Sequence, residues 1–217
     1  MRAPDRPRVT GSLIQYGAGF CAPATWRNFD ASPTLWFERL PVLGRLYTRN
    51  ARRFPPNVEV GDIVRGLPVP PGSARAVYAS HVIEHLALND ARAALRNTVA
   101  LLVPGGMFRM VVPDLEALAR RYLSENSPTA AASFMRDSGL GKESRPRSLH
   151  GMVRDWLGNS AHLWMWDFKA LASELADAGF IGVRRCVPGD SPEPRFVDVE
   201  DPERFADAVA IECERPV

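Results

Sequence analysis

The chain has 217 residues, of which 46% are hydrophobic and 24% are charged, and this composition suits one soluble globular domain with a sizeable core. Its 27 basic and 25 acidic residues leave a net charge of +2, which gives no electrostatic reason to expect a nucleic acid partner. The three cysteines are widely spaced and form no Cys-x-x-Cys pair, so they suggest neither a disulfide framework nor a thiolate zinc site.

The amino-terminal residues lack the apolar segment of a secretory signal, and we expect residues 1–10 to be a disordered lead-in. No apolar run approaches the ~20 residues of a membrane span. Because reduced thiols are the rule inside the cell, these features favour a cytoplasmic protein without a membrane span. The whole chain, 1–217, is expected to form a single domain.

The first strand is predicted over Ser12–Tyr16, and it runs into Gly17-Ala18-Gly19. Glycines suit such a turn because a Cβ would block the close approach of a ligand. The next apolar stretch ends at Asp30, which follows Gly17 by only 13 residues, so a helix between the two strands must be very short or absent. An acid at this strand end is placed to bind a ribose.

The following elements are read from caps and periodicity. Ser32-Pro33 starts a helix whose apolar residues continue to Tyr47, with a break expected at Pro41. Short strands are predicted at 57–60, which ends at Gly61-Asp62, and at 76–80. Asn89 is expected to cap a helix that Pro104-Gly105-Gly106 ends, and the apolar run 107–112 reads as a buried parallel strand.

Asp114 is expected to start a further helix, after which Ser124–Ala161 breaks the alternation of strands and helices. Because insertions after a strand's carboxyl end lie over the ligand crevice, we expect residues 115–161 to form a lid or an acceptor-binding insertion. Asp167 caps a helix that stops at Gly179, and strands follow at 181–187 and 209–214. The pattern predicts an α/β fold with a doubly wound, mostly parallel, seven-stranded Rossmann-like sheet.

The order of these motifs resembles the class I S-adenosylmethionine-dependent methyltransferases, and most of all the small bacterial branch called methyltransferase type 11. The motifs are the Gly17-x-Gly19 turn, the acids Asp30 and Asp62, the strand end Ser80-x-x-x-Glu84-His85, and Leu102-x-Pro104-Gly105-Gly106. The resemblance covers about Leu13 to Val112 and resumes from His162 to Pro216. It implies an antiparallel hairpin of the last two strands.

The resemblance also implies S-adenosylmethionine as cofactor. Gly17 and Gly19 would approach its methionine part, Asp30 the ribose and Asp62 the adenine amino group. The remaining cofactor-binding candidates are Gln15, Ile63 for the adenine ring, and Ser80 and His81 at the strand end. Position 15 carries Gln where many relatives carry an acid, and Cys21 stands where a third glycine is common.

The segment from His81 to His85 admits three interpretations. It can be a purely structural strand end, or His81 or His85 can be the general base for an acceptor hydroxyl. Some related O-methyltransferases bind a divalent cation through Glu-x-x-Glu-His; here His81 replaces the first Glu, Glu84 and His85 match, and a further ligand could be His150 or His162. A metal is possible, but a metal-free site is favoured because one carboxylate offers little negative charge.

The predicted activity is methyl transfer to the oxygen or nitrogen of a small-molecule, sugar or natural-product acceptor. Two alternatives stay open. The first is a non-catalytic module that binds a nucleoside cofactor, which Gln15 and Cys21 would allow. The second is an aminopropyltransferase-like enzyme, although the acid-rich amine site of such enzymes is not evident. The sequence does not indicate an oligomeric state.

Overall fold

The computed structural model describes residues 10–41, 44, 52–144 and 161–217. Three parts of the predictions lie outside the described residues. They are residues 1–9 of the expected lead-in, most of the helical continuation toward Tyr47, and residues 145–160 of the expected lid, which include His150. None of the described helices is long and apolar enough to span a membrane.

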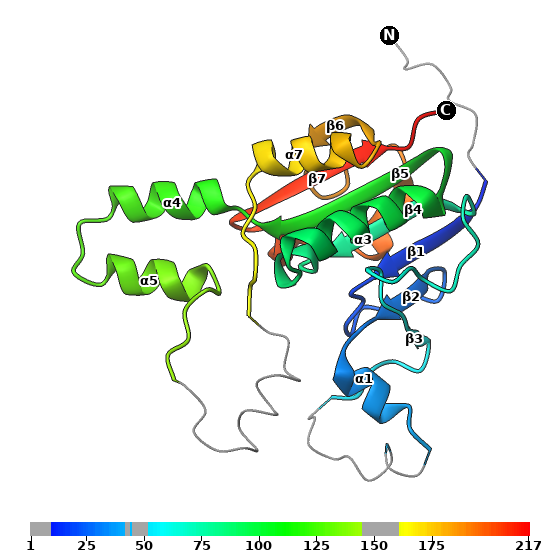
Figure 1. Ribbon diagram of the computed structural model, residues 1–217, viewed down its shortest axis with the longest axis horizontal. Coiled ribbons are helices and arrows are strands. Elements are labelled where there is room, and N and C mark those ends of the chain that lie inside the picture. Colours follow the sequence, from blue (N-terminus) through cyan, green and yellow to red (C-terminus); the bar gives the residue numbers. More distant parts are fainter. Residues whose placement is uncertain (1–9, 42–43, 45–51, 145–160) are drawn as a thin grey trace.

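A seven-stranded sheet in the order β3-β2-β1-β4-β5-β7-β6 forms the centre of the protein (Figure 1). The strands are β1 (Ser12–Tyr16), β2 (Arg27–Asp30), β3 (Val58–Val60), β4 (Ala74–Ser80), β5 (Leu102–Pro113), β6 (Ile181–Arg185) and β7 (Ala208–Glu214). Strands β1 to β5 pair in parallel, whereas β7 runs antiparallel to β5 and β6. The order reverses between β1 and β4, so the predicted doubly wound sheet with an antiparallel end is confirmed.

The helical elements are α1 (Pro33–Glu38), η1 (Ile83–His85), α3 (Leu88–Leu101), α4 (Leu115–Ser124), α5 (Ala130–Asp137), α7 (Phe168–Asp177), η2 (Pro194–Asp198) and η3 (Pro202–Phe205). Three predicted caps are confirmed. Ser32 accepts a hydrogen bond from the Thr34 N–H, and Asp114 and Asp167 cap α4 and α7 in the same way. No helix forms between β1 and β2, as the short spacing predicted, since residues 17–26 make only turns and loops.

The predicted bounds of the helix after β4 are wrong. Helix α3 starts at Leu88 rather than after Asn89, and it ends at Leu101, before the Pro-Gly-Gly motif. Leu102 already pairs with Ala74, and the register then jumps to Ala76 and Met107, so residues 103–106 bulge out of β5. Within the expected insertion, Ala130–Asp137 forms α5, which packs beside α4 through Tyr122 and Phe134 (Figure 1).

The two faces of the sheet are covered differently. Helices α3 and α7 cover one face, where Phe108 and Met110 of β5 join the main core (Figure 1). On the other face, Val111 packs with Phe196 and Val199, which come from the connection between β6 and β7. This connection, residues 186–207, replaces helices with two short 3-10 turns, and we call it the β6–β7 connection.

Arg109 of β5 holds the β6–β7 connection against the sheet. Its side chain is fully buried, its Nη2 donates to the Val187 carbonyl and to Asp190 Oδ1 at 2.6 Å, and its Nε lies 2.7 Å from Glu200 Oε1. Its Nη1 is 3.1 Å from Glu212 Oε2 on β7. Buried ions are stable only when paired and hydrogen-bonded, so the connection must stay where its acids meet this guanidinium.

We expect Arg109→Met to lower the free energy of unfolding by ~3–5 kcal/mol, because it leaves the buried carboxylate of Glu200 without its cation, whereas Glu212 keeps its pair with Arg184. Urea unfolding measures this loss. The control is Arg27→Met, which removes an exposed pair with Glu59 and should cost less than ~1 kcal/mol. Equal effects of the two changes would contradict the role of Arg109.

The same cluster predicts a dependence of stability on pH. Burial alone would raise the pKa of Asp190, but hydrogen bonds from Arg184 and Arg109 outweigh it and lower this pKa to about 2. Since the folded pKa lies below the ordinary value of 3.8, Asp190 stabilises the fold above pH 3.8, and this contribution is lost as the pH falls toward 2. In urea unfolding, the stability difference between the wild type and Asp190→Asn should therefore shrink over this range. A difference independent of pH would refute the prediction.

Candidate functional site

The turn after β1 has the geometry that its glycines predicted. Gly17 and Gly19 adopt left-handed backbone angles, with φ of 67° and 53°. A Cβ on Gly17 would overlap Cγ2 of Val82, whereas a Cβ on Gly19 would meet no atom within 4 Å among the described residues. Gly17 is therefore required by close packing against the turn after β4, and Gly19 by its backbone angle alone.

Asp30 at the end of β2 holds this turn in place. Its Oδ2 accepts the Gly19 N–H at 2.9 Å, and its Oδ1 accepts the Ser32 N–H at 2.8 Å. The carboxylate is nearly buried, and both oxygens have a backbone partner. Asp30 thus orders the loops around the strand ends, and any contact with a ribose would use the remaining lone pairs.

Gln15 is buried and hydrogen-bonded within the fold. Its Nε2 lies 2.6 Å from the Cys21 carbonyl and 2.5 Å from Asn28 Oδ1. The amide nitrogen therefore serves to tie β1 to β2 and to the loop that follows β1. Only its carbonyl oxygen remains available for the ammonium group of a ligand.

A cavity of about 350 Å³ lies at the carboxyl ends of β1 and β4. This volume falls in the range of ~300–1,000 Å³ that is typical of small-molecule sites. The cavity brings together three predicted residues, Gln15, Gly17 and Ser80. Its other lining residues are Tyr16, Ala18, Phe20, Cys21, Arg52, Tyr78, Val199, Asp201 and Arg204.

Three cavity residues, Val199, Asp201 and Arg204, come from the β6–β7 connection, and the sequence did not predict them. Arg204 spans the gap to the sheet, because its Nη1 donates to the Ser80 carbonyl at 3.1 Å and lies 3.4 Å from Ser80 Oγ. An arginine in a polar stretch about 120 residues away carries no sequence signal for such a contact.

Asp62 and Ile63 follow β3 and do not line this cavity. Asp62 Oδ1 accepts the Val64 N–H at 2.9 Å, and Asn97 of α3 donates to the carbonyls of Ile63 and Val64. Ile63 is only 4% exposed and belongs to the main core, so little of its side chain is left for an adenine ring. The roles of Asp62 and Ile63 toward a cofactor stay predictions.

His81 begins the turn after β4 in a left-handed conformation, with φ of 54°, which is rare outside glycine. Its Nε2 lies 3.1 Å from the Arg204 carbonyl and its Nδ1 lies 3.2 Å from Glu84 Oε1. Burial lowers the pKa of His81, but the close Glu84 carboxylate and the hydrogen bond to the Arg204 carbonyl outweigh it and leave the pKa raised. Because both ring nitrogens face acceptors, the arrangement favours a charged imidazolium, which is not a base.

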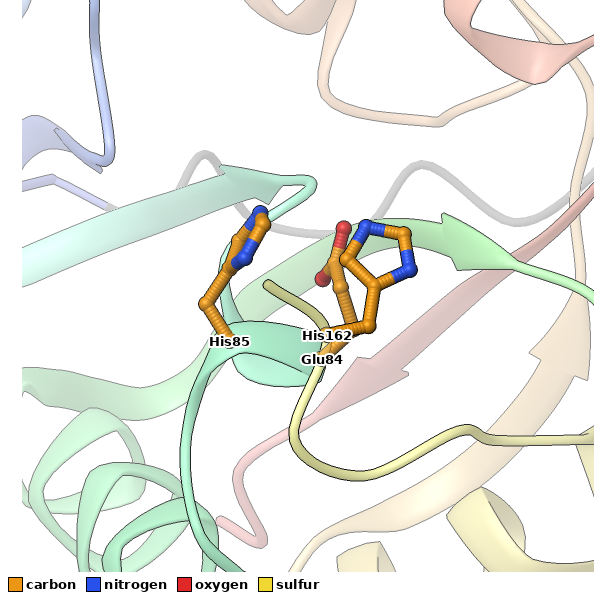
Figure 2. Close-up of side chains that lie close together, drawn as sticks. All are labelled: Glu84, His85 and His162. Atoms are coloured by element: carbon orange, nitrogen blue, oxygen red, sulfur yellow. The ribbon is translucent and has the colours of Figure 1, made fainter. Parts of the chain in front are cut away.

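Glu84 and His85 of η1 meet His162, which lies just before α7 (Figure 2). One ligating atom from each side chain lies within 4.8 Å of the other two. The two imidazole rings pack edge to face with centroids 4.9 Å apart. Next to them is a second cavity of about 410 Å³, to which His81, Leu118 and His162 contribute. His150, the other histidine considered as a ligand, is not described.

Comparisons with known proteins bear on this site. Residues 38–110 match the family Methyltransf_11, described as a methyltransferase domain, and this match confirms the resemblance to methyltransferase type 11. It covers β3, β4, η1 and most of β5, with Asp62, Ser80 and His81 among its residues. No curated protein matches the chain.

Solved structures of methyltransferases are similar in part. One from Haloferax volcanii, in complex with the activator Trm112, has 16% identity and a TM-score of 0.49, and the match covers 97% of this chain and 85% of that one. A SAM-dependent methyltransferase from Archaeoglobus fulgidus has 13% identity and a TM-score of 0.49, and the match covers 95% of this chain and 86% of that one.

Phosphoethanolamine N-methyltransferase 2 from Haemonchus contortus has 12% identity and a TM-score of 0.47, and the match covers 97% of this chain and 50% of that one. The chain thus spans half the length of this structure, and much the same share of several others. At such identities and scores the similarity says nothing about what this chain binds.

The two glycines provide a matched pair of substitutions. We expect Gly19→Ala to cost ~1–2 kcal/mol of stability, the usual cost of a side chain in the left-handed region. Gly17→Ala should cost a further ~1–3 kcal/mol, because its Cβ also overlaps Val82. Thermal or urea unfolding of both variants measures the difference, and equal losses would contradict the packing of Gly17 against the turn after β4.

Proposed function

We propose that this protein is an S-adenosylmethionine-dependent methyltransferase that binds its cofactor at the carboxyl ends of β1, β2 and β4. The observation that carries the proposal is the ordered strand-end turn. Gly17 and Gly19 are left-handed, Asp30 holds the Gly19 N–H, and the adjoining cavity is lined by Gln15 and Ser80. The family match over residues 38–110 supports the same activity.

Each predicted cofactor residue has a part in this proposal. The close backbone at Gly17 and Gly19 admits the methionine portion, and the Gln15 carbonyl is the acceptor for its ammonium group. Asp30 binds the ribose through the lone pairs that Gly19 and Ser32 leave, and Asp62 accepts from the adenine amino group. Ser80 and His81 form the strand end nearest to the acceptor, and the edge of Ile63 faces the ring.

The sulfonium of the cofactor makes its methyl group electrophilic, so the cofactor itself supplies the activated group for transfer. The protein has to align the acceptor for in-line attack and to exclude water. A base is needed only when the acceptor is a hydroxyl or a protonated amine. Between the two proposed bases, His85 is the better candidate, because its Nδ1 is held by the Ala161 carbonyl and its Nε2 is left as a proton acceptor. His81, in contrast, faces two acceptors.

The acceptor is proposed to be a small molecule, a sugar or a natural product, methylated at oxygen or nitrogen. The second cavity supports an acceptor of modest size, since it lies beside His81 and His162 and takes Leu118, Arg121 and Asp137 from α4 and α5. On this proposal, residues 115–161 form the acceptor side of the site. Arg121 of α4 is already paired with Asp137 and Asp207, so these polar groups favour an acceptor that carries a hydroxyl.

The alternative is a binding module without turnover. The buried Gln15 favours it, because the amide nitrogen is used within the fold and only one oxygen is left for the cofactor. Cofactor binding without methyl transfer to any component of a metabolite extract would support this alternative. Transfer of a labelled methyl group to one component would exclude it.

We expect Asp30→Ala to weaken the binding of S-adenosylmethionine by ~1–3 kcal/mol, about 5- to 150-fold in Kd, because a charge-assisted hydrogen bond is lost and the Gly19 turn is freed. Isothermal titration calorimetry measures the affinity, and circular dichroism checks the fold. The control is Glu59→Gln, an exposed carboxylate on the neighbouring strand β3, which should leave the affinity unchanged.

If a folded Asp30→Ala protein bound S-adenosylmethionine with unchanged affinity, Asp30 would not be a cofactor-binding residue. A wild-type protein that binds neither S-adenosylmethionine nor S-adenosylhomocysteine would refute the proposed function itself.

A further inference from the structure

Glu84 is a fully buried carboxylate that lacks the partners such a group requires. Its Oε1 lies 3.2 Å from His81 Nδ1, but neither carboxylate oxygen makes a well-aligned hydrogen bond to any described residue. Burial of a charged group without hydrogen bonds or a counter-ion is costly. His81 lies beside Oε1 alone, so Oε2 of Glu84 has neither a hydrogen-bond donor nor a counter-ion within the described part of the chain.

The two imidazoles beside Glu84 are held in the tautomer that binds metals. His85 Nδ1 lies 3.1 Å from the Ala161 carbonyl, and His162 Nδ1 lies 2.7 Å from the Ser138 carbonyl. A carbonyl oxygen can only accept, so each Nδ1 carries the proton and each Nε2 keeps a free lone pair. Backbone carbonyls commonly orient metal-binding histidines in this manner.

The fold itself brings the three side chains together. The Glu84 carbonyl accepts the N–H groups of Leu163 and Trp164, at 2.7 and 3.1 Å, and so fixes the segment that carries His162 against η1. Gly139 leaves the space for the His162 ring, because a Cβ at this position would overlap it. Figure 2 shows the Glu84 carboxylate and the two rings facing the same space above η1.

We propose that Glu84, His85 and His162 bind a divalent first-row transition metal ion of the zinc class. Two neutral imidazoles and one carboxylate suit such an ion, whereas magnesium prefers oxygen ligands throughout. In a tetrahedral site with ligands ~2.0–2.2 Å from the ion, the ligand atoms lie ~3.3–3.6 Å from one another. The three ligand atoms, which lie within 4.8 Å of one another, would reach this spacing if each side chain moved inward by up to roughly 1 Å.

This ligand set differs from the one that the sequence indicated. His162 takes the place of His81, which instead lies 3.2 Å from Glu84 Oε1 through its Nδ1 and would orient the carboxylate. Three protein ligands leave one position open for water or for an oxygen of a bound molecule, and one of the ligands, His162, lines the second cavity. His85 then serves as a ligand rather than as a base. The proposal does not rest on methyl transfer, because it concerns metal binding in the absence of any methyl donor.

The test is the zinc affinity of the full chain, measured by calorimetry after removal of bound metal, together with the absorption spectrum of the cobalt(II)-loaded protein. We expect one zinc ion per chain, and cobalt(II) bands of a four- or five-coordinate site. His162→Ala and Glu84→Gln should each weaken zinc binding by at least ~100-fold, because each removes a ligand. His81→Asn should weaken zinc binding less, because His81 only orients Glu84. The control is Glu116→Gln, a half-buried carboxylate on α4 that pairs with Arg120, and it should have no effect.

The wild-type protein decides the outcome even where Glu84→Gln fails to fold, since its stoichiometry and cobalt(II) spectrum need no variant. Absence of stoichiometric zinc would overturn the proposal. The proposal would also be overturned if His162→Ala left the zinc affinity unchanged. It would equally be overturned if His81→Asn abolished zinc binding and His162→Ala did not. None of these results depends on whether S-adenosylmethionine binds.

Discussion

The position of the β6–β7 connection depends on the buried guanidinium of Arg109. The connection has no long helix with which to pack on the sheet, and it is held by the cation of Arg109 and the acids Asp190 and Glu200. Replacing a buried ion cluster by apolar residues is often neutral or stabilising, so the cluster need not add to the stability of the fold. Its role is to determine where the β6–β7 connection lies on the sheet. The acids can meet Arg109 in few arrangements, and the observed one places Arg204 over the end of β4.

A series of contacts then joins the two halves of the candidate site. Arg204 reaches Ser80 through its side chain and His81 through its carbonyl, and His81 contacts the buried Glu84. The strand-end cavity and the Glu84–His85–His162 cluster are thus connected through one residue in a strained conformation. Strain of this kind is retained where the surroundings fix it, and such positions are frequent at functional sites. A substitution of Arg109 would therefore alter both the strand-end cavity and the Glu84–His85–His162 cluster.

Local signals predicted most of the fold, because they depend on residues close in sequence. The strand over Ser12–Tyr16 and the caps at Asp114 and Asp167 are confirmed as read. The Pro-Gly-Gly motif was misread, since nothing local shows that Leu102 already pairs with Ala74. For the site, motifs located the turn of Gly17 and the Glu84-His85 pair. They could not assign a role to Arg109 or Arg204, because a lone arginine is read as exposed until its long-range partners are known.

A crystal structure of the protein with S-adenosylhomocysteine tests the proposed cofactor site most directly. We expect the ligand at the carboxyl ends of β1 and β2, with its ribose at Asp30 and its sulfur near the cavity between Gly17 and Ser80. The β6–β7 connection should keep its contacts with Arg109 in the complex. A ligand bound elsewhere, or one bound only after Arg204 and its connection have left the strand ends, would contradict the account.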